Sequence, residues 1–82
     1  MREYKELIKN CKQAYKNNDL KLAYNYWCEI FDITFKKLDE LDDFDDKNRF
    51  KVWKKHNKVM EKFTNDEVYR ITDYGKRQAY YC

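Results

Sequence analysis

The sequence has few residues that break helices or make tight turns: its 82 residues include one glycine and no proline. β-Sandwiches and barrels usually need these residues at their turns, so an all-β fold is disfavoured. A glycine-rich phosphate loop and a flexible low-complexity chain are excluded on the same ground. We therefore expect a mostly helical protein, and the length predicts a single helical domain over residues 1–82.

Serine is absent and there is one histidine, His56, so the chain cannot assemble a Ser–His triad. His56 falls within the apolar arc of a predicted helix, which is typical of a core imidazole with one hydrogen bond. Cys11, Cys28 and Cys82 are far apart and show no CxxC spacing, so we interpret them as reduced thiols. We predict that the protein is not an enzyme and that it holds no metal and no cofactor.

Long apolar runs are also missing. No segment approaches the roughly 18 apolar residues that cross a bilayer, and residues 1–6 lack the apolar region of a signal peptide. We therefore expect a cytoplasmic protein with no membrane partner. Lys, Asn and Tyr, which have AT-rich codons, are abundant, and this bias fits a phage or another mobile element.

Apolar residues recur at helical spacing along the whole chain. Asn18 can adopt the left-handed conformation that ends a helix, and Asp19 is a good N-cap for the next one. The pattern predicts an all-α fold, a small antiparallel bundle of three to four helices. The expected helices span residues 2–16, 20–41, 46–63 and 65–81.

The second of these helices, 20–41, is apolar over roughly two thirds of its circumference. It is therefore either the central helix of the bundle or a surface for a homodimer. The third helix, 46–63, has a narrower apolar side. That side is predicted to contain Phe50, Val52, Trp53, His56, Val59, Met60 and Phe63.

The tail allows two interpretations. Thr64 and Glu67 match a capping box, which favours a helix over 65–81. The alternative makes residues 68–72 a short β segment followed by a turn at 73–75. We prefer the helix, because the cap is specific and a lone strand has no partner.

Charge is segregated along the chain. Residues 39–46 carry −6 and the rest carries +9, which together give the net +3. The acidic segment lacks the EF-hand pattern, because Asn48 stands where that loop needs glycine. Lysines lie opposite the apolar side of the first and third helices, and some tyrosines must remain at the surface. The candidate partner-binding residues are Lys47, Lys51, Lys54, Lys55, Lys58, Lys62, Lys5, Lys9, Lys12, Tyr80 and Tyr81.

These patterns predict a non-catalytic intracellular binding protein, an inhibitor, regulator or accessory factor that acts by stoichiometric protein–protein contact. One alternative is a small nucleic-acid-binding regulator that uses the Lys face of the third helix. Another is a bacteriocin-immunity-type helical bundle, which the chain resembles in size, helicity and Lys content.

Overall fold

The computed structural model describes the backbone of residues 3–81 and the side chains of residues 3–78. Within this part of the chain there are four helices and no strand. The predicted small all-α bundle is confirmed, and the β alternative for residues 68–72 is wrong. The helices are α1 (Tyr4–Lys16), α2 (Leu20–Asp39), α3 (Asp46–Met60) and α4 (Asn65–Tyr81).

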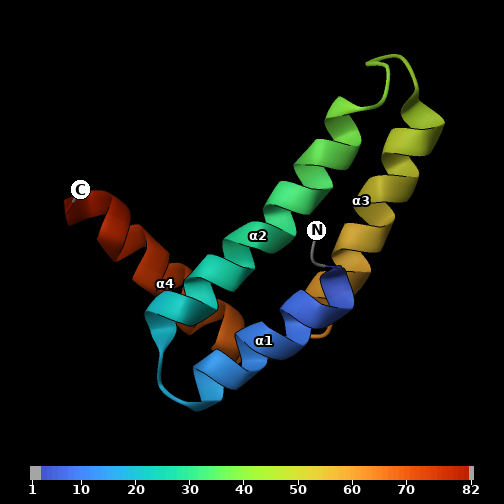
Figure 1. The fold of residues 1–82 in the computed structure, drawn as a ribbon. Coiled ribbons are helices and arrows are strands. Elements are labelled where there is room, and N and C mark those ends of the chain that lie inside the picture. The colour runs from blue at the N-terminus through green and yellow to red at the C-terminus, as the bar shows by residue number, and fades with distance from the viewer. Residues whose placement is uncertain (1–2, 82) are drawn as a thin grey trace.

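The α2 helix is central, because α1, α3 and α4 all pack against it. α1 and α2 form one antiparallel hairpin, and α3 returns beside α2 to form a second (Figure 1). α4 runs across α2 rather than alongside it (Figure 1). The tip of the α2–α3 hairpin extends beyond the start of α1, so no third helix covers it (Figure 1).

The turn between α1 and α2 follows the predicted chemistry. Asn18 has a φ of 62°, the left-handed conformation that asparagine tolerates. The Asp19 carboxylate accepts a hydrogen bond from the Leu22 backbone N–H at 3.1 Å. This bond satisfies one of the free donors at the start of α2.

The capping box explains why the tail is helical. The Thr64 hydroxyl accepts from the Glu67 N–H at 3.1 Å, and the Glu67 carboxylate accepts from the Thr64 N–H at 2.8 Å. The same carboxylate pairs with Lys12 Nζ at 3.0 Å, which ties α4 to α1. Burial alone would raise the pKa of Glu67, but the Thr64 N–H and the Lys12 ammonium together hold it below its ordinary value.

Two helices end earlier than the periodicity predicts. After Asp39 and after Met60 the chain tightens into short turns instead of continuing the helix. The Leu41 N–H donates to the Leu38 carbonyl at 3.1 Å, and the Phe63 N–H donates to the Met60 carbonyl at 3.1 Å. These three-residue bonds replace four-residue helical bonds, so the apolar pattern extends past the helix itself.

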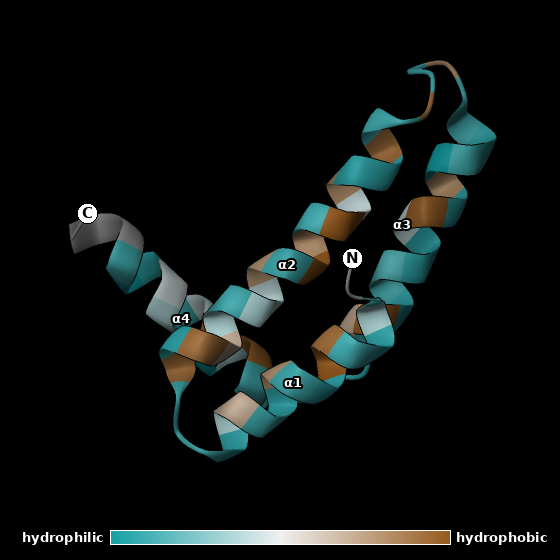
Figure 2. Ribbon diagram, in the orientation of Figure 1, coloured by the Kyte–Doolittle hydropathy of each residue, from teal (hydrophilic) through white to brown (hydrophobic). Residues whose placement is uncertain are grey.

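The core lies mainly between α1 and α2, where apolar residues of both helices face each other (Figure 2). The rings of Trp27 and Phe63 meet edge to face at 5.1 Å, which joins the α3–α4 turn to the core. The buried core residues are Tyr4, Leu7, Cys11, Ala14, Ala23, Trp27, Ile30, Ile33, Val59, Phe63 and Ile71.

The predicted apolar side of the third helix is wrong at its N-terminal end. Phe50 is 68% exposed and Trp53 is 38% exposed, because only α2 lies beside this part of α3. On α2, the partner helices cover most of the broad apolar surface. Leu22 and Phe35 are the large apolar residues of α2 that stay exposed.

Candidate functional site

Lysines from three helices surround a hollow on one side of the molecule. Lys5 lies on α1, Lys37 on α2 and Lys55 on α3, and Lys62 follows the end of α3. The hollow has a volume of about 780 Å³. Its lining also contains Glu3, Tyr4, Ile8 and Ile33.

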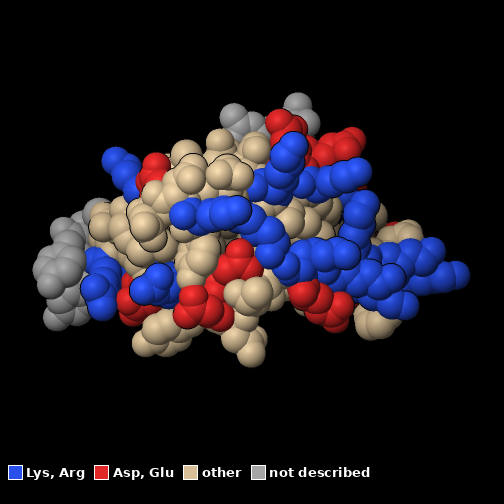
Figure 3. Space-filling view, turned by 90° about the horizontal axis from the view of Figure 1, so that it is seen from below, with Lys and Arg blue, Asp and Glu red and all other residues tan. Residues whose placement is uncertain are grey.

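We call this the basic hollow. Lys and Arg side chains gather in a band over the underside of the molecule, with Asp and Glu side chains along its edges (Figure 3). Within the basic hollow Glu3 supplies the one carboxylate among the lining residues. The arrangement is therefore suited to an anion.

The Tyr4 ring links two of these lysines. Lys37 Nζ lies 4.8 Å from the centre of the ring, and Lys55 Nζ lies 5.8 Å from it. Ammonium groups are attracted to the negative face of an aromatic ring, so Tyr4 holds both lysines near the hollow. Tyr4 itself is buried and contributes to the core.

Behind the hollow, three side chains form a buried hydrogen-bonded chain. Tyr4 Oη and Thr34 Oγ1 are 2.5 Å apart, and Thr34 Oγ1 is 2.7 Å from His56 Nδ1. Thr34 also donates to the Ile30 carbonyl at 3.3 Å. Thr34 Oγ1 thus has three hydrogen-bond partners, which matches the one proton and two lone pairs of a hydroxyl.

This chain confirms His56 as a core imidazole with a hydrogen-bond partner. Burial lowers the pKa of His56 below its ordinary value, so the ring is neutral at pH 7. Thr34 was not among the residues expected to be important. Its signal in the sequence is a hydroxyl residue placed between the apolar positions Ile33 and Leu38 of α2.

A group of exposed aromatic rings lies on the α2–α3 hairpin, and we call it the aromatic ledge. It consists of Phe35 on α2 and of Phe50 and Trp53 on α3, and Phe35 is 49% exposed. The rings of Phe35 and Trp53 meet edge to face at 6.1 Å. Trp53 in turn lies 5.5 Å from the ring of His56, which connects the ledge to the core.

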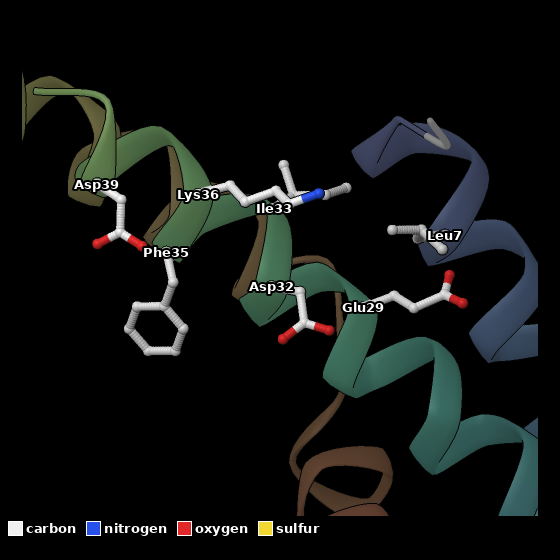
Figure 4. A pocket seen from close by; sticks show the side chains of 7 residues that line it. All are labelled: Leu7, Glu29, Asp32, Ile33, Phe35, Lys36 and Asp39. Carbon is white, nitrogen blue, oxygen red and sulfur yellow. The ribbon is translucent and has the colours of Figure 1, made fainter.

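The outer face of α2 beside the ledge carries acidic side chains. The carboxylates of Asp32 and Asp39 project on either side of Phe35, and that of Glu29 lies one turn away (Figure 4). These residues line a hollow of about 620 Å³ that also contains Lys36. The ledge is therefore bordered by carboxylates on α2. On α3, Lys54 follows Phe50 by four residues and so shares its side of the helix.

The structure separates the predicted lysines into three groups. Lys5, Lys55 and Lys62 meet at the basic hollow. Lys12 is tied to Glu67 and is 36% exposed, so it serves the fold. The side chains of Tyr80 and Tyr81 lie outside the described residues. The other predicted lysines are exposed on α1 and α3: Lys9, Lys47, Lys51, Lys54 and Lys58.

Lys37 lines the basic hollow but was not among the predicted partner-binding residues. It follows Ile33 by four residues and Ile30 by seven, which places it within the apolar arc of α2. A lysine within an apolar arc is the signal that could have identified it. Its side chain is half-buried, with the ammonium over the Tyr4 ring.

The cysteines of the described region are unpaired. Cys11 is buried and its Sγ donates to the Ala23 carbonyl at 3.2 Å. Burial, followed by the charge of Glu67, raises the pKa of Cys11 to about 12. The Cys11 thiol is therefore protonated and a poor nucleophile.

A metal site and a membrane-spanning helix are both absent from the part of the chain that the structure describes. No three His, Cys, Asp or Glu side chains gather closely enough to hold a metal ion there. None of the described helices combines the length and apolar character needed to span a bilayer. Searches against known protein families, curated proteins and solved structures find no match to the chain.

Proposed function

We propose that this protein is a non-catalytic regulator or inhibitor that binds a partner protein in the cytoplasm. The observation that carries the proposal is the aromatic ledge of Phe35, Phe50 and Trp53, which stays exposed beside the lysines of α3. Trp and other aromatic residues dominate the energy of protein interfaces, whereas isolated exposed apolar residues are common. The rings of Phe35 and Trp53 are in contact, and Phe50 precedes Trp53 by three residues on α3, so these aromatic residues are neighbours.

The charges around the ledge favour a protein over a nucleic acid as the partner. Asp32 and Asp39 border Phe35, and carboxylates there repel a phosphate backbone. A protein surface can offer an apolar side chain to the ledge, acidic residues to Lys54 and basic residues to Asp32. The free cysteines Cys11 and Cys28 suit a reducing compartment.

The proposal is tested by capture of partners from cells that make the protein. Wild-type protein is compared with Phe50→Ala/Trp53→Ala, and Tyr69→Ala is the matched control, because Tyr69 is 70% exposed on α4. We expect one protein to be retained in stoichiometric amount, by wild type and by the control but not by the double variant. Purified partner should bind the double variant at least about 30-fold more weakly, since a central aromatic contributes about 2 kcal/mol or more.

Two results would overturn the protein-partner proposal. One is capture that does not change between wild type and the double variant. The other is capture that nuclease treatment abolishes. Circular dichroism of the double variant shows that it is folded, which we expect because Phe50 and Trp53 contribute little to the core.

A second candidate function, nucleic-acid binding, is favoured by the band of Lys and Arg on the underside (Figure 3). Binding to duplex DNA or RNA should weaken steeply with salt, because each neutralised phosphate releases counterions. Lys54→Glu/Lys58→Glu should then abolish retention, and Phe50→Ala/Trp53→Ala should leave it unchanged. Lack of retention at low salt would exclude this function.

A further inference from the structure

We propose that the basic hollow is a binding site for a compact polyphosphate, a small anion that carries two or more linked phosphate groups. The site is separate from the aromatic ledge and does not depend on the partner proposed above. It is formed by Lys5, Lys37, Lys55 and Lys62, and the Tyr4 ring contacts the ammonium groups of Lys37 and Lys55. Its volume of about 780 Å³ falls in the range of small-molecule sites.

The first support is the excess of positive charge, because four lysines and one carboxylate line the hollow. The ammonium groups of Lys37 and Lys55 lie 4.8 and 5.8 Å from the centre of the same Tyr4 ring, so one aromatic ring serves two cations of the hollow. Within residues 3–78 the observed ion pairs join Lys12 to Glu67 and Arg77 to Asp73, and none involves the four lysines of the hollow. A bound anion would relieve the repulsion among these lysines.

The second support is the way in which the lysines are positioned. The Tyr4 ring contacts the ammonium groups of both Lys37 and Lys55, and the Tyr4 hydroxyl is fixed by its hydrogen bond to Thr34. Lys37 is half-buried, so its ammonium has fewer positions available than that of a fully exposed lysine. Less conformational freedom is then lost when an anion binds, which strengthens binding.

The shape of the hollow indicates the class of anion. Its lysines come from three helices and face a common space, whereas Lys47, Lys51, Lys54 and Lys58 follow one another along α3. A nucleic-acid backbone presents phosphates in a line and suits the row on α3. A compact polyphosphate brings several charges to one place and suits the hollow, where four lysines face the one carboxylate of Glu3.

The test uses inorganic tripolyphosphate as the probe and the full chain as the protein. Isothermal titration at low salt compares wild type, Lys37→Gln/Lys55→Gln and the matched control Lys47→Gln/Lys54→Gln, which removes the same charge from the row on α3. We expect one molecule to bind per chain. The hollow variant should bind at least about tenfold more weakly and the control less than about twofold, because contacts to charged groups are worth more than distant charges.

Further arms distinguish the source of the phosphate. A nucleoside triphosphate should bind and compete with tripolyphosphate, and single phosphate ions should bind much more weakly. NMR should show shifts of the Tyr4, Lys37 and Lys55 amides on addition of tripolyphosphate. Phe50→Ala/Trp53→Ala should bind tripolyphosphate as wild type does, so failure of the partner proposal and failure of this one can be told apart.

Two results would overturn the proposal. One is the absence of saturable tripolyphosphate binding to wild type at low salt. The other is an equal loss of tripolyphosphate binding in both double variants, which would indicate diffuse attraction to the whole basic band. Circular dichroism on each variant confirms the fold, and Lys37→Arg, which keeps the charge, should retain at least part of the binding.

Discussion

The two hairpins that share α2 are packed very differently. In the α1–α2 hairpin, Leu7 and Cys11 of α1 are fully buried. In the α2–α3 hairpin, the buried residues of α3 are His56 and Val59, and Phe50 stays 68% exposed. The difference indicates that the first hairpin carries most of the stability, whereas the second presents side chains for binding.

The largest expected effect compares one apolar residue from each hairpin. Leu7→Ala should lower the free energy of unfolding by about 2–5 kcal/mol, because it leaves a cavity at a fully buried position. Phe50→Ala should change it by less than about 0.5 kcal/mol, since the ring is mostly in water. Urea unfolding followed by circular dichroism measures both. Similar losses for the two variants would contradict the comparison.

The next effect concerns the polar chain that holds α3 on α2. Thr34→Val keeps the shape of the side chain but removes the hydroxyl that serves Tyr4 and His56. We expect a loss of about 1–3 kcal/mol, because two buried polar groups lose their partner. Thr34→Ser keeps the hydroxyl and is the control, which should lose less. Hydrogen exchange should show α3 losing protection before α1, and equal stability of Thr34→Val and wild type would contradict this role.

The pH dependence of stability should come from His56, which belongs to the same hydrogen-bonded group as Tyr4 and Thr34. Burial lowers the pKa of His56 in the folded protein below the ordinary 6.5 of the unfolded chain. The unfolded state therefore binds more protons as the pH falls below about 6.5, and stability decreases in that direction. The slope for one such group is at most about 1.4 kcal/mol per pH unit. Urea unfolding between pH 7.5 and 5.5 measures it, and a profile that His56→Gln leaves unchanged would assign the effect elsewhere.

The fold could be predicted from the sequence because its signals are local. The Asn18–Asp19 turn and the capping box of Thr64 and Glu67 are set by residues a few positions apart, and both formed as expected. The exposure of Phe50 could not be predicted in the same way. Periodicity shows which face of a helix is apolar, but not whether another helix is long enough to cover it.

The candidate sites could be predicted only in part, for a similar reason. The sequence predicted that Lys55 and Lys62 belong to one helix, although α3 ends at Met60, and it did not predict that Lys5 and Lys37 of other helices meet them. Convergence of side chains from three helices depends on tertiary packing. The hydrogen bonds of Thr34 likewise join residues 30 and 22 positions apart in the chain.

The smallest expected effect concerns the close packing of α2 against α4 at Gly75. A Cβ at Gly75 would lie 2.2 Å from a ring carbon of Tyr24, so a side chain there must displace the ring from its edge-to-face contact with Tyr74. Alanine gains about 1 kcal/mol over glycine in a helix, which offsets part of this cost. Gly75→Ala should therefore lower the free energy of unfolding by about 1 kcal/mol or less.

In a Tyr24→Ala background the same substitution should raise the free energy of unfolding by about 0.5–1 kcal/mol, because the clash is gone and the helix propensity remains. A double-mutant cycle of urea unfolding measures the change of sign. If Gly75→Ala has the same effect in both backgrounds, the close approach of the Tyr24 ring does not limit packing between α2 and α4.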